Sequence, residues 1–380
     1  MCEYVISDCY VTPPTPFKHL TILLLDCWQR EYDKRPYRHF RFSRLEFEEK
    51  MNRTFLFYLD FKVIVKFIDL RILKSVVLRG VFVIGEPDIV ATFLKVLRPV
   101  KRIELLLMHL PDLFFKILGE CGLVMSATNL ILDGTPLNEN AVRGLRSFLI
   151  DSKTLEEISV ANCDISQFKF AMLADGVHKS TSLKIFDCSG LIGNYITLET
   201  RKMASIVSSL ILQNKLEVLK LNNCQFFAQD MEVIAEYLYR TKSKLYELEL
   251  ACNNIDSDGV RYLLRAIAKS GTLKRLDISR NGLGTHGGEV VAHYLSSCFQ
   301  LEYLNIETNK IGASAMNLIL TTLKKPVTLK YLQVRGNEFD LKSATILRRI
   351  LKALVLPQDT IDITSRYDGS FDNFRVVPYF

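Results

Sequence analysis

The sequence predicts an α/β solenoid shaped like a horseshoe, with parallel strands on its concave side and helices on its convex side. Two observations support this prediction. Apolar residues recur in one pattern, with a step of 28 residues in the most regular part of the chain. The second half of each step instead carries apolar residues at helical spacing. A strand followed by a helix in every step indicates a unit that buries its apolar side only by stacking on its neighbours.

The repeated pattern is L-x-x-L-x-L-x-x-N/C-x-L. In the unit that begins at Leu273, it is filled by Leu276, Ile278, Asn281 and Leu283. Four units of this kind have first leucines at a constant spacing of 28 residues: Leu245, Leu273, Leu301 and Leu329. This regularity predicts consecutive strands that stack in register.

The pattern continues upstream with more variation. Further units begin at Leu155, Leu183 and Leu216, and degenerate ones lie around Leu130, Ile103 and Val76. The step from Leu183 to Leu216 is 33 residues, which predicts an insertion near residues 193–202. We therefore expect about ten repeats of 27–33 residues.

The second half of each unit has the spacing of an amphipathic helix. Val260, Leu263, Leu264 and Ile267 lie at i, i+3, i+4 and i+7. Helices are about 10 Å wide, whereas neighbouring strands lie only about 4.8 Å apart. A stack of such units must therefore curve, with its strands on the concave side.

The ninth position of the pattern holds Asn or Cys. The chain turns there from strand towards helix, which leaves buried backbone groups without partners. An Asn amide has both donors and an acceptor for such groups. We interpret Asn253, Asn281, Asn309 and Asn337 as scaffold residues, and Cys163 and Cys224 as small buried thiols in the same position.

The 28-residue step, the Asn or Cys position and the full helix in each unit resemble the ribonuclease-inhibitor class of leucine-rich repeats over residues 73–355. Relatives of this class include ribonuclease inhibitor, the GTPase-activating protein of Ran, tropomodulins, NOD-like receptors and the leucine-rich-repeat subunit of the T-complex/dynein regulatory complex of cilia. The resemblance implies an α/β leucine-rich-repeat solenoid. The sequence has a non-repeat segment before the repeats and no effector domain beside them, which favours the ciliary subunit by analogy.

Three regions are predicted: an N-terminal helical and aromatic cap at 1–70, the solenoid at 71–355, and a capping strand and tail at 356–380. The cap is expected to contain a helix between Pro16 and Pro36, then a β-rich stretch from Asn52 that leads into the first strand. Ile361 and Ile363 are candidates for a last strand. An alternative role for the cap is docking on an acidic surface, through basic residues interleaved with aromatic ones: Arg30, Lys34, Arg35, Arg38, Arg41 and Arg44, with Tyr32, Tyr37, Phe40 and Phe42.

The composition excludes several classes of protein. The formal net charge of +7 is small for 380 residues, and the acidic residues among the N-terminal basic ones argue against nucleic acid as a partner. The nine cysteines form no CxxC pair, so neither a disulfide framework nor a zinc site is expected. The sequence shows no signal peptide and no apolar run long enough to span a bilayer. These features predict a cytoplasmic protein, with a cytoskeletal or ciliary location as the finer hypothesis.

One motif suggests a cofactor. Gly282, Gly284 and Gly287 form G-x-G-x-x-G, with Glu307 twenty residues after Gly287 as in a dinucleotide fingerprint. The glycines lie in register with the turns of neighbouring repeats, so structural glycines are the better interpretation. No catalytic arrangement, metal site or cofactor is predicted, and the chain is expected not to be an enzyme.

The candidate binding surface is the concave side, where residues between the pattern leucines point outward from the strands. Tyrosines on successive strands are typical binding anchors, and arginines can pair with acidic groups. The predicted function is a protein–protein interaction scaffold or adaptor that binds protein partners within a larger complex. The alternative is a regulator of an enzyme, either an inhibitor or a small-GTPase activator. The predicted binding residues are Lys220, Glu247, Glu249, Arg275, Asp277, Tyr303, Asn305, Glu307, Tyr331, Gln333 and Arg335.

Overall fold

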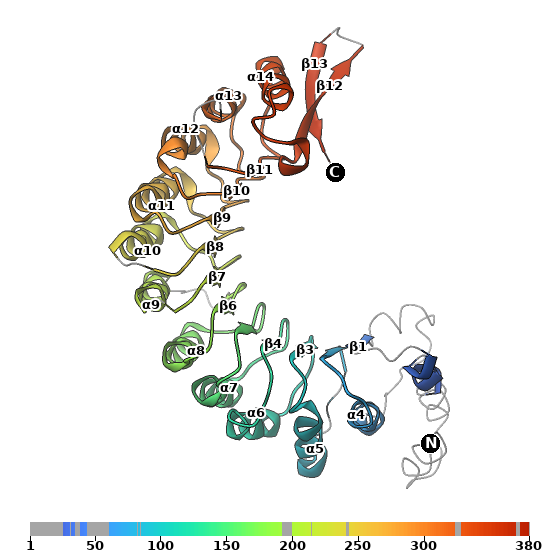
Figure 1. The fold of residues 1–380 in the computed structure, drawn as a ribbon. Coiled ribbons are helices and arrows are strands. Elements are labelled where there is room, and N and C mark those ends of the chain that lie inside the picture. The colour runs from blue at the N-terminus through green and yellow to red at the C-terminus, as the bar shows by residue number, and fades with distance from the viewer. Residues whose placement is uncertain are drawn as a thin grey trace. The chain divides into compact units, whose positions relative to one another are not determined.

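A computed structural model describes residues 26–30, 32–34, 39–43, 61–81, 83, 85–191, 200–213, 215–240, 243–323, 328–369 and 373–379. The chain falls into two compact units, Met1–Leu183 and Lys184–Phe380, called unit 1 and unit 2 below. Within each unit, short strands line one side and helices line the other (Figure 1). Among the described residues, every helix is too short or too polar to cross a lipid bilayer.

Unit 1 contains parallel strands that follow the order of the chain. Its strands are β1 (His39–Ser43), β2 (Ser75–Arg79), β3 (Arg102–Leu106), β4 (Asn129–Ile131) and β5 (Glu157–Ser159). Its helices are α4 (Phe61–Asp69), α5 (Pro87–Leu97), α6 (Asp112–Glu120), α7 (Glu139–Asp151) and α8 (Gln167–Lys179).

Unit 2 repeats the arrangement and ends in a hairpin. Its parallel strands are β6 (Ile185–Asp187), β7 (Val218–Lys220), β8 (Glu247–Glu249), β9 (Arg275–Asp277), β10 (Tyr303–Asn305) and β11 (Tyr331–Gln333). Its helices are α9 (Thr200–Leu212), α10 (Ala228–Arg240), α11 (Asp256–Ser270), α12 (Gly284–Tyr294), η1 (Leu295–Ser297), α13 (Ala313–Thr322), α14 (Leu341–Lys352) and η2 (Gln358–Thr360). The hairpin strands are β12 (Ile363–Asp368) and β13 (Asn373–Pro378).

The pattern leucines form the core between the strands and the helices. Leu248, Leu276, Leu304 and Leu332 occupy one register position on successive strands, and each is fully buried. The apolar stripe of α11 that includes Val260 and Leu263 is also buried. The predicted repeat of a parallel strand and a helix is therefore confirmed in both units.

The predicted role of the asparagines at the ninth position of the repeat is confirmed by their hydrogen bonds. The Asn281 side chain donates to Leu250 O at 2.9 Å in the preceding repeat and accepts from Ile255 N at 3.4 Å. Its own backbone amide donates to the side chain of Asn309 at 2.7 Å. The Asn281 amide thus connects its own turn to the repeat before it and satisfies buried backbone groups there.

The same position accepts thiols and a hydroxyl. Cys163 is buried, with Sγ 3.1 Å from Leu132 O, as the sequence predicts for a packed thiol. In the repeat that contains β4, Thr135 takes this place. Its hydroxyl donates to Leu105 O at 2.8 Å and accepts from Met108 N at 3.1 Å. The repeat pattern does not identify Thr135, because it allows only Asn or Cys at this position.

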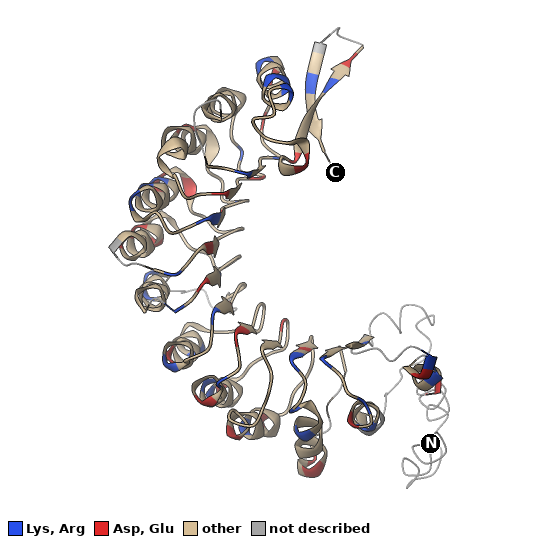
Figure 2. Ribbon diagram, viewed as in Figure 1, with Lys and Arg blue, Asp and Glu red and all other residues tan. Residues whose placement is uncertain are grey.

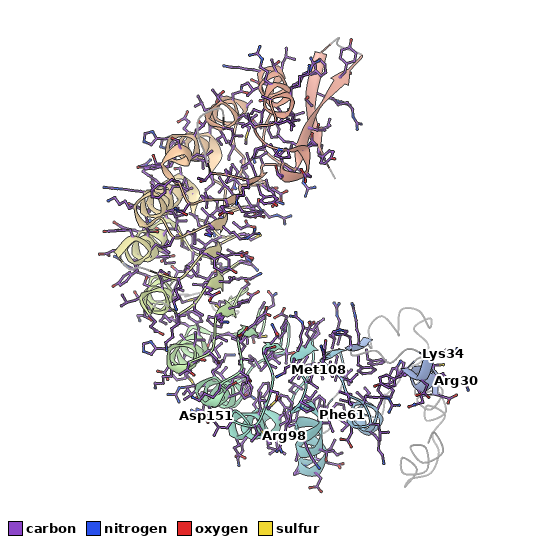
Figure 3. All side chains as sticks on the ribbon, viewed as in Figure 1. Arg30, Lys34, Phe61, Arg98, Met108 and Asp151 are labelled. Atoms are coloured by element: carbon purple, nitrogen blue, oxygen red, sulfur yellow. The ribbon has the colours of Figure 1, made fainter. Side chains whose placement is uncertain are left out.

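The N-terminal region differs from the expectation in two ways. Phe61–Asp69 is a helix, α4, although its aromatic and β-branched residues predict a strand. The expectation fails because Phe61, Ile64, Val65 and Ile68 have helical spacing and are buried together, and burial outweighs local strand propensity. Figure 3 labels Phe61 on this helix, and Arg30 and Lys34 on the helical residues 26–30 and 32–34. Arg35, Arg38, Arg44, Tyr37 and the predicted strand stretch at 52–60 lie outside the described residues.

Strand β1 is the second difference, because the sequence predicts no repeat before residue 71. Phe40 and Phe42 pair in parallel with Val76 and Leu78 of β2, and all four side chains are buried. Phenylalanines therefore occupy the positions that leucines hold elsewhere. Trp28 packs against both rings, with centroid distances of 5.1 and 5.4 Å.

The predicted last strand is formed only in part. Ile361 makes one parallel bridge with Leu332 of β11, but Ile363 begins β12, which pairs antiparallel with β13. The Arg348 guanidinium of α14 lies 4.1 Å from the centre of the Phe374 ring on β13. The tail after Ser365 thus folds back on the terminal helix.

Candidate functional site on the strands of unit 2

The candidate site is the outward side of strands β6–β11 together with the two residues that follow each strand, called the strand face below. The structure brings all eleven predicted binding residues onto it, nine on the strands and two, Glu307 and Arg335, just beyond β10 and β11. Asn305 is buried, while Tyr331 and Arg335 are exposed. The other eight are half-buried. Parallel register holds these side chains in rows that run across the strands.

The first row contains Glu247, Arg275, Tyr303 and Tyr331. Arg275 Nε lies 3.2 Å from Glu247 Oε2, and its guanidinium lies 4.2 Å from the centre of the Tyr303 ring. The Tyr303 hydroxyl donates to Gln333 Oε1 at 2.6 Å. Burial raises the pKa of Tyr303 to about 12, and the negative charge of Asp277 acts in the same direction.

The two tyrosines therefore differ, although the sequence predicts a matched pair of exposed anchors. Tyr303 is half-buried between Arg275 and Gln333, whose long side chains reach across the neighbouring strands. Tyr331 is 46% exposed because it lies on the last parallel strand of the series. Tyr331 is thus the aromatic side chain of this row that is free to contact a partner.

The second row contains Lys220, Glu249, Asp277 and Asn305. Lys220 Nζ lies 2.9 Å from Glu249 Oε1, and the Asn305 amide donates to Asp277 Oδ2 at 2.9 Å. Burial lowers the pKa of Lys220, but the hydrogen bond and charge of Glu249 outweigh it, so the pKa lies above its ordinary value. Lys220 is therefore held charged on the strand face.

Beyond the strands, Glu307, Arg335 and Asp362 meet. Arg335 Nε lies 3.5 Å from Glu307 Oε1. Burial raises the pKa of Glu307, and a hydrogen bond to Asp362 adds to the effect. Sequence reasoning missed Asp362. The sequence could have indicated Asp362 through Ile361, which precedes it directly. Ile361 lies one repeat step beyond Leu332 and forms a parallel bridge with it.

The strand face is polar, and acidic residues outnumber basic ones. Acidic and basic positions alternate along the strands of unit 2 in Figure 2. Its described carboxylates are Asp187, Glu247, Glu249, Asp277 and Glu307, with Asp362 beside Glu307, and its described cations are Lys220, Arg275 and Arg335. The contacts between them hold these side chains in fixed positions.

A family model, the MHP1/HER1/GIP3 LRR domain, matches residues 122–355, which is more than half of the chain. The chain belongs to this leucine-rich-repeat family. The match covers most of the strand face and every strand from β4 to β11. It confirms the α/β leucine-rich-repeat fold that the 28-residue step predicts.

The chain is also similar to individual proteins. Mouse ribonuclease inhibitor is 32% identical over 145 residues, which is 37% of this chain and 30% of the inhibitor. The chain therefore spans less than a third of that relative's length. The structure of the yeast Rad7 and Elc1 complex superposes with a TM-score of 0.51 at 15% identity, covering 80% of this chain and 68% of that one. LegL7 from Legionella pneumophila gives a TM-score of 0.48 at 15% identity, covering 77% of this chain and 91% of LegL7.

The family match and the identity with mouse ribonuclease inhibitor confirm the ribonuclease-inhibitor type of leucine-rich repeat. The leucine-rich-repeat fold is a scaffold for protein–protein interaction, since its stacked strands present a long, fixed surface. In this family the G-x-G-x-x-G motif also has a structural explanation. Gly282 and Gly284 have φ values of +67° and +64°, and Lys310, one repeat after Gly282, adopts +56°. Gly282 and Gly284 thus occupy left-handed turn positions of the leucine-rich repeat, and Gly287 lies within α12.

The buried cysteines of the leucine-rich repeats are packing residues. Burial raises the pKa of the Cys224 thiol to about 12 and that of Cys188 well above its ordinary range. A thiol with such a pKa is a poor nucleophile at neutral pH. Among the described residues, no three His, Cys, Asp or Glu side chains gather as metal ligands.

Proposed function

We propose that this protein is a non-catalytic interaction scaffold or adaptor that binds a protein partner on the strand face of unit 2. The observation that supports this most directly is the fixed polar network around Tyr303, beside the exposed ring of Tyr331. Interfaces concentrate binding energy in aromatic and arginine side chains that are surrounded by fixed polar contacts. Tyr331 and Arg335 are the exposed members of this surface.

The experiment is affinity purification of the tagged full chain, followed by titration with the purified partner. Tyr331→Ala is expected to weaken the partner's binding about thirtyfold, as for an aromatic anchor worth about 2 kcal/mol. The matched control is Tyr262→Ala on α11, an exposed tyrosine on the helical side. If the partner binds Tyr331→Ala and Arg335→Glu with the same affinity as the wild type, the strand face is not its docking surface. Tyr303→Ala is a less clean variant, because Tyr303 also bonds Gln333.

The finer proposal is a structural subunit of a larger ciliary, axonemal or other cytoskeletal assembly in the cytoplasm. It rests on the resemblance to the ciliary leucine-rich-repeat subunit, which is an analogy of fold. Localisation of the tagged chain in ciliated cells tests it. A diffuse distribution that excludes cilia and the cytoskeleton would contradict the proposal.

The second candidate function is regulation of an enzyme, as an inhibitor or a small-GTPase activator. The identity of 32% with part of mouse ribonuclease inhibitor favours the inhibitor form. The two candidates differ in a simple measurement, the turnover of the purified partner or of a ribonuclease with and without this chain. Unchanged turnover at saturating binding supports the scaffold.

A further inference from the structure

The regular block of repeats in unit 2 contains one chemically reactive pair of residues. Asn281 and Gly282 form the only Asn-Gly pair in the sequence. In such a pair the backbone nitrogen of the glycine can attack the side-chain amide of the asparagine, because a glycine without Cβ leaves its nitrogen accessible and its backbone free to turn. The reaction is intramolecular, so it needs only the right orientation of the two groups.

The folded chain holds the Asn281 amide away from this reaction. Asn281 is 3% exposed, and its Nδ2 donates to Leu250 O and Ser279 O, each at 2.9 Å. Its side-chain oxygen accepts from Ile255 N at 3.4 Å. Attack by Gly282 N requires the side chain to rotate out of these bonds, and the later hydrolysis requires water to enter. The amide is therefore protected for as long as its repeat stays closed.

The fold does not require a glycine after this asparagine. Gly282 has a φ of +67°, but the residues at the same position of other repeats, Gln225 and Lys310, both adopt +56°. Nothing lies within 4 Å of a Cβ placed on Gly282. A side chain is therefore tolerated here, with the same left-handed conformation that the other repeats carry. The reactive pair is a property of this one repeat and not of the repeat pattern.

A chain that has lost this amide cannot remake the same contacts. Deamidation turns the side chain into a carboxylate, which has no hydrogen to donate and would face the carbonyl oxygens of Leu250 and Ser279. A buried carboxylate beside two acceptors is strongly unfavourable. The second possible product, isoaspartate, also lengthens the backbone by a methylene group. The lengthening falls directly after the Asn281 backbone amide, which donates to Asn309 Oδ1 at 2.7 Å.

We propose that the Asn281-Gly282 pair is a deamidation site that is exposed when its repeat opens, and that its conversion prevents the repeat from closing again. Gly282 N loses its proton and bonds Asn281 Cγ, and the Cγ–Nδ2 bond breaks to release ammonia. Water then opens the cyclic imide at one of its two carbonyls, which gives aspartate or isoaspartate. Water is consumed and ammonia is released, so no further reactant is needed. The modification thus records how often this part of unit 2 has opened.

The test incubates the full chain at pH 8, in buffer and in unfolding guanidinium chloride, and follows Asn281 and Asn309 by peptide mass spectrometry. Asn281 is expected to convert at least about a hundredfold more slowly in buffer, because only the open fraction reacts. Asn309 is the internal control, since its amide donates to Ile278 O at 3.0 Å but Lys310 follows it. It is expected to convert slowly in both conditions. Equal rates for Asn281 in the two conditions would overturn the proposal.

Two variants separate this site from general ageing of the chain. Gly282→Gln, which copies the residue that Gln225 places at the same turn, is expected to slow conversion of Asn281 in the unfolded chain at least about tenfold. Asn309→Ala removes the acceptor of the Asn281 backbone amide and is expected to speed conversion in buffer. Its matched control is Asn138→Ala, which removes the N-cap of α7 in unit 1 and is expected to leave the rate unchanged. Equal acceleration in both alanine variants would contradict opening of this repeat as the route.

The effect on folding is measured by thermal melts after the guanidinium chloride is removed. Converted wild-type chain is expected to melt at a lower temperature than fresh chain, as is Asn281→Asp. Gly282→Gln, incubated in the same way, is expected to regain the midpoint that it had before incubation. If the converted wild type also regained its original midpoint, conversion would not prevent closure, and the proposal would be refuted. This comparison holds even where Asn281→Asp does not fold, because it uses chains that were folded at the start.

Discussion

The side-chain carboxylate of Asp362 accepts a hydrogen bond from the backbone amide of Val334 at 2.9 Å. Its second oxygen accepts from Arg335 N, also at 2.9 Å. In the preceding repeat the amide equivalent to Val334 donates to the next strand, as Ile306 N donates to Gln333 O at 2.9 Å, whereas the amide equivalent to Arg335, Glu307 N, donates to Asn305 Oδ1 at 3.0 Å. Asp362 therefore supplies the acceptor that a further repeat would provide for Val334, and it also accepts from Arg335 N.

We expect Asp362→Ala to destabilise the end of unit 2. The substitution leaves the partly buried Val334 amide without an acceptor, at a cost of about 1–3 kcal/mol, and exposes the Arg335 amide to water. Urea unfolding measures the loss, and hydrogen exchange at Val334 and Arg335 locates it. Asp359→Ala is the control, since Asp359 is exposed on η2. Unchanged exchange at both amides would contradict the capping role.

We expect Asn281→Ala to lower stability without altering the strand face. Its side chain bonds Leu250 O and Ile255 N of the preceding repeat. The substitution would leave the buried Ile255 amide unpaired, while Leu250 O would keep only the Asn253 amide as its donor. The expected cost is about 1–3 kcal/mol. Thermal melts compare this variant with Arg265→Ala, whose side chain lies on the exposed part of α11. Equal midpoints would refute the scaffold role of the asparagine.

We expect Glu307→Gln to be more stable than the wild type at neutral pH and to lose this advantage at acidic pH. The pKa of Glu307 is raised in the folded state by burial and by Asp362, so the folded protein binds its proton more tightly than the unfolded chain. The stability of the wild type therefore falls as pH rises from the ordinary Glu pKa to the raised one. Glutamine does not titrate, so the variant avoids this loss of stability at pH values above the raised pKa. Below the ordinary Glu pKa the wild type has lost no stability, and the variant has no advantage there.

The measurement for Glu307→Gln is the difference in Tm from the wild type across the pH range. Glu302 provides the opposite case. A hydrogen bond from Lys330 lowers the pKa of Glu302, and its pairing stabilises above the ordinary Glu pKa and is lost as pH falls. Glu302→Gln is therefore expected to show the reverse pH trend. If the Tm difference from the wild type changed with pH in the same direction for both variants, the opposite pKa shifts of Glu307 and Glu302 would be contradicted.

We expect the cysteines to differ sharply towards an alkylating reagent. Burial raises the pKa values of Cys224 and Cys298 to about 12, while Cys252 is exposed on a turn. Iodoacetamide at pH 8 is expected to modify Cys252 in the folded protein and to spare the other two. Mass spectrometry of tryptic peptides reads out the sites, with urea-unfolded protein as the control. Rapid modification of Cys224 would argue against its packing role.

The regular block of repeats was predictable because each unit meets the same surroundings. Leu248, Leu276 and Leu304 have equivalent neighbours on both sides, so one pattern describes them all. Strand β1 escaped prediction because Phe40 and Phe42 fill the leucine positions with different side chains.

The candidate site was predictable in position but not in its contacts. Alternation along a strand places Arg275 and Tyr303 on the strand face whatever their partners are. The stacking between them, and the bond from Tyr303 to Gln333, depend on the lengths and rotamers of side chains on neighbouring strands. Asp362 lies after the last pattern leucine, where the periodicity no longer specifies which residue follows.

The asparagines at the ninth position also imply a difference in how parts of the chain open. From Asn253 to Asn337, each side-chain amide links consecutive repeats. Loss of one link weakens the next, so the backbone amides of this block are expected to exchange their hydrogens together. Cys163 offers only a weak sulfur donor at the same place, and Thr135 a single hydroxyl. Repeats joined by these residues are expected to open singly and more often, which makes them the natural entry points for unfolding and for proteases.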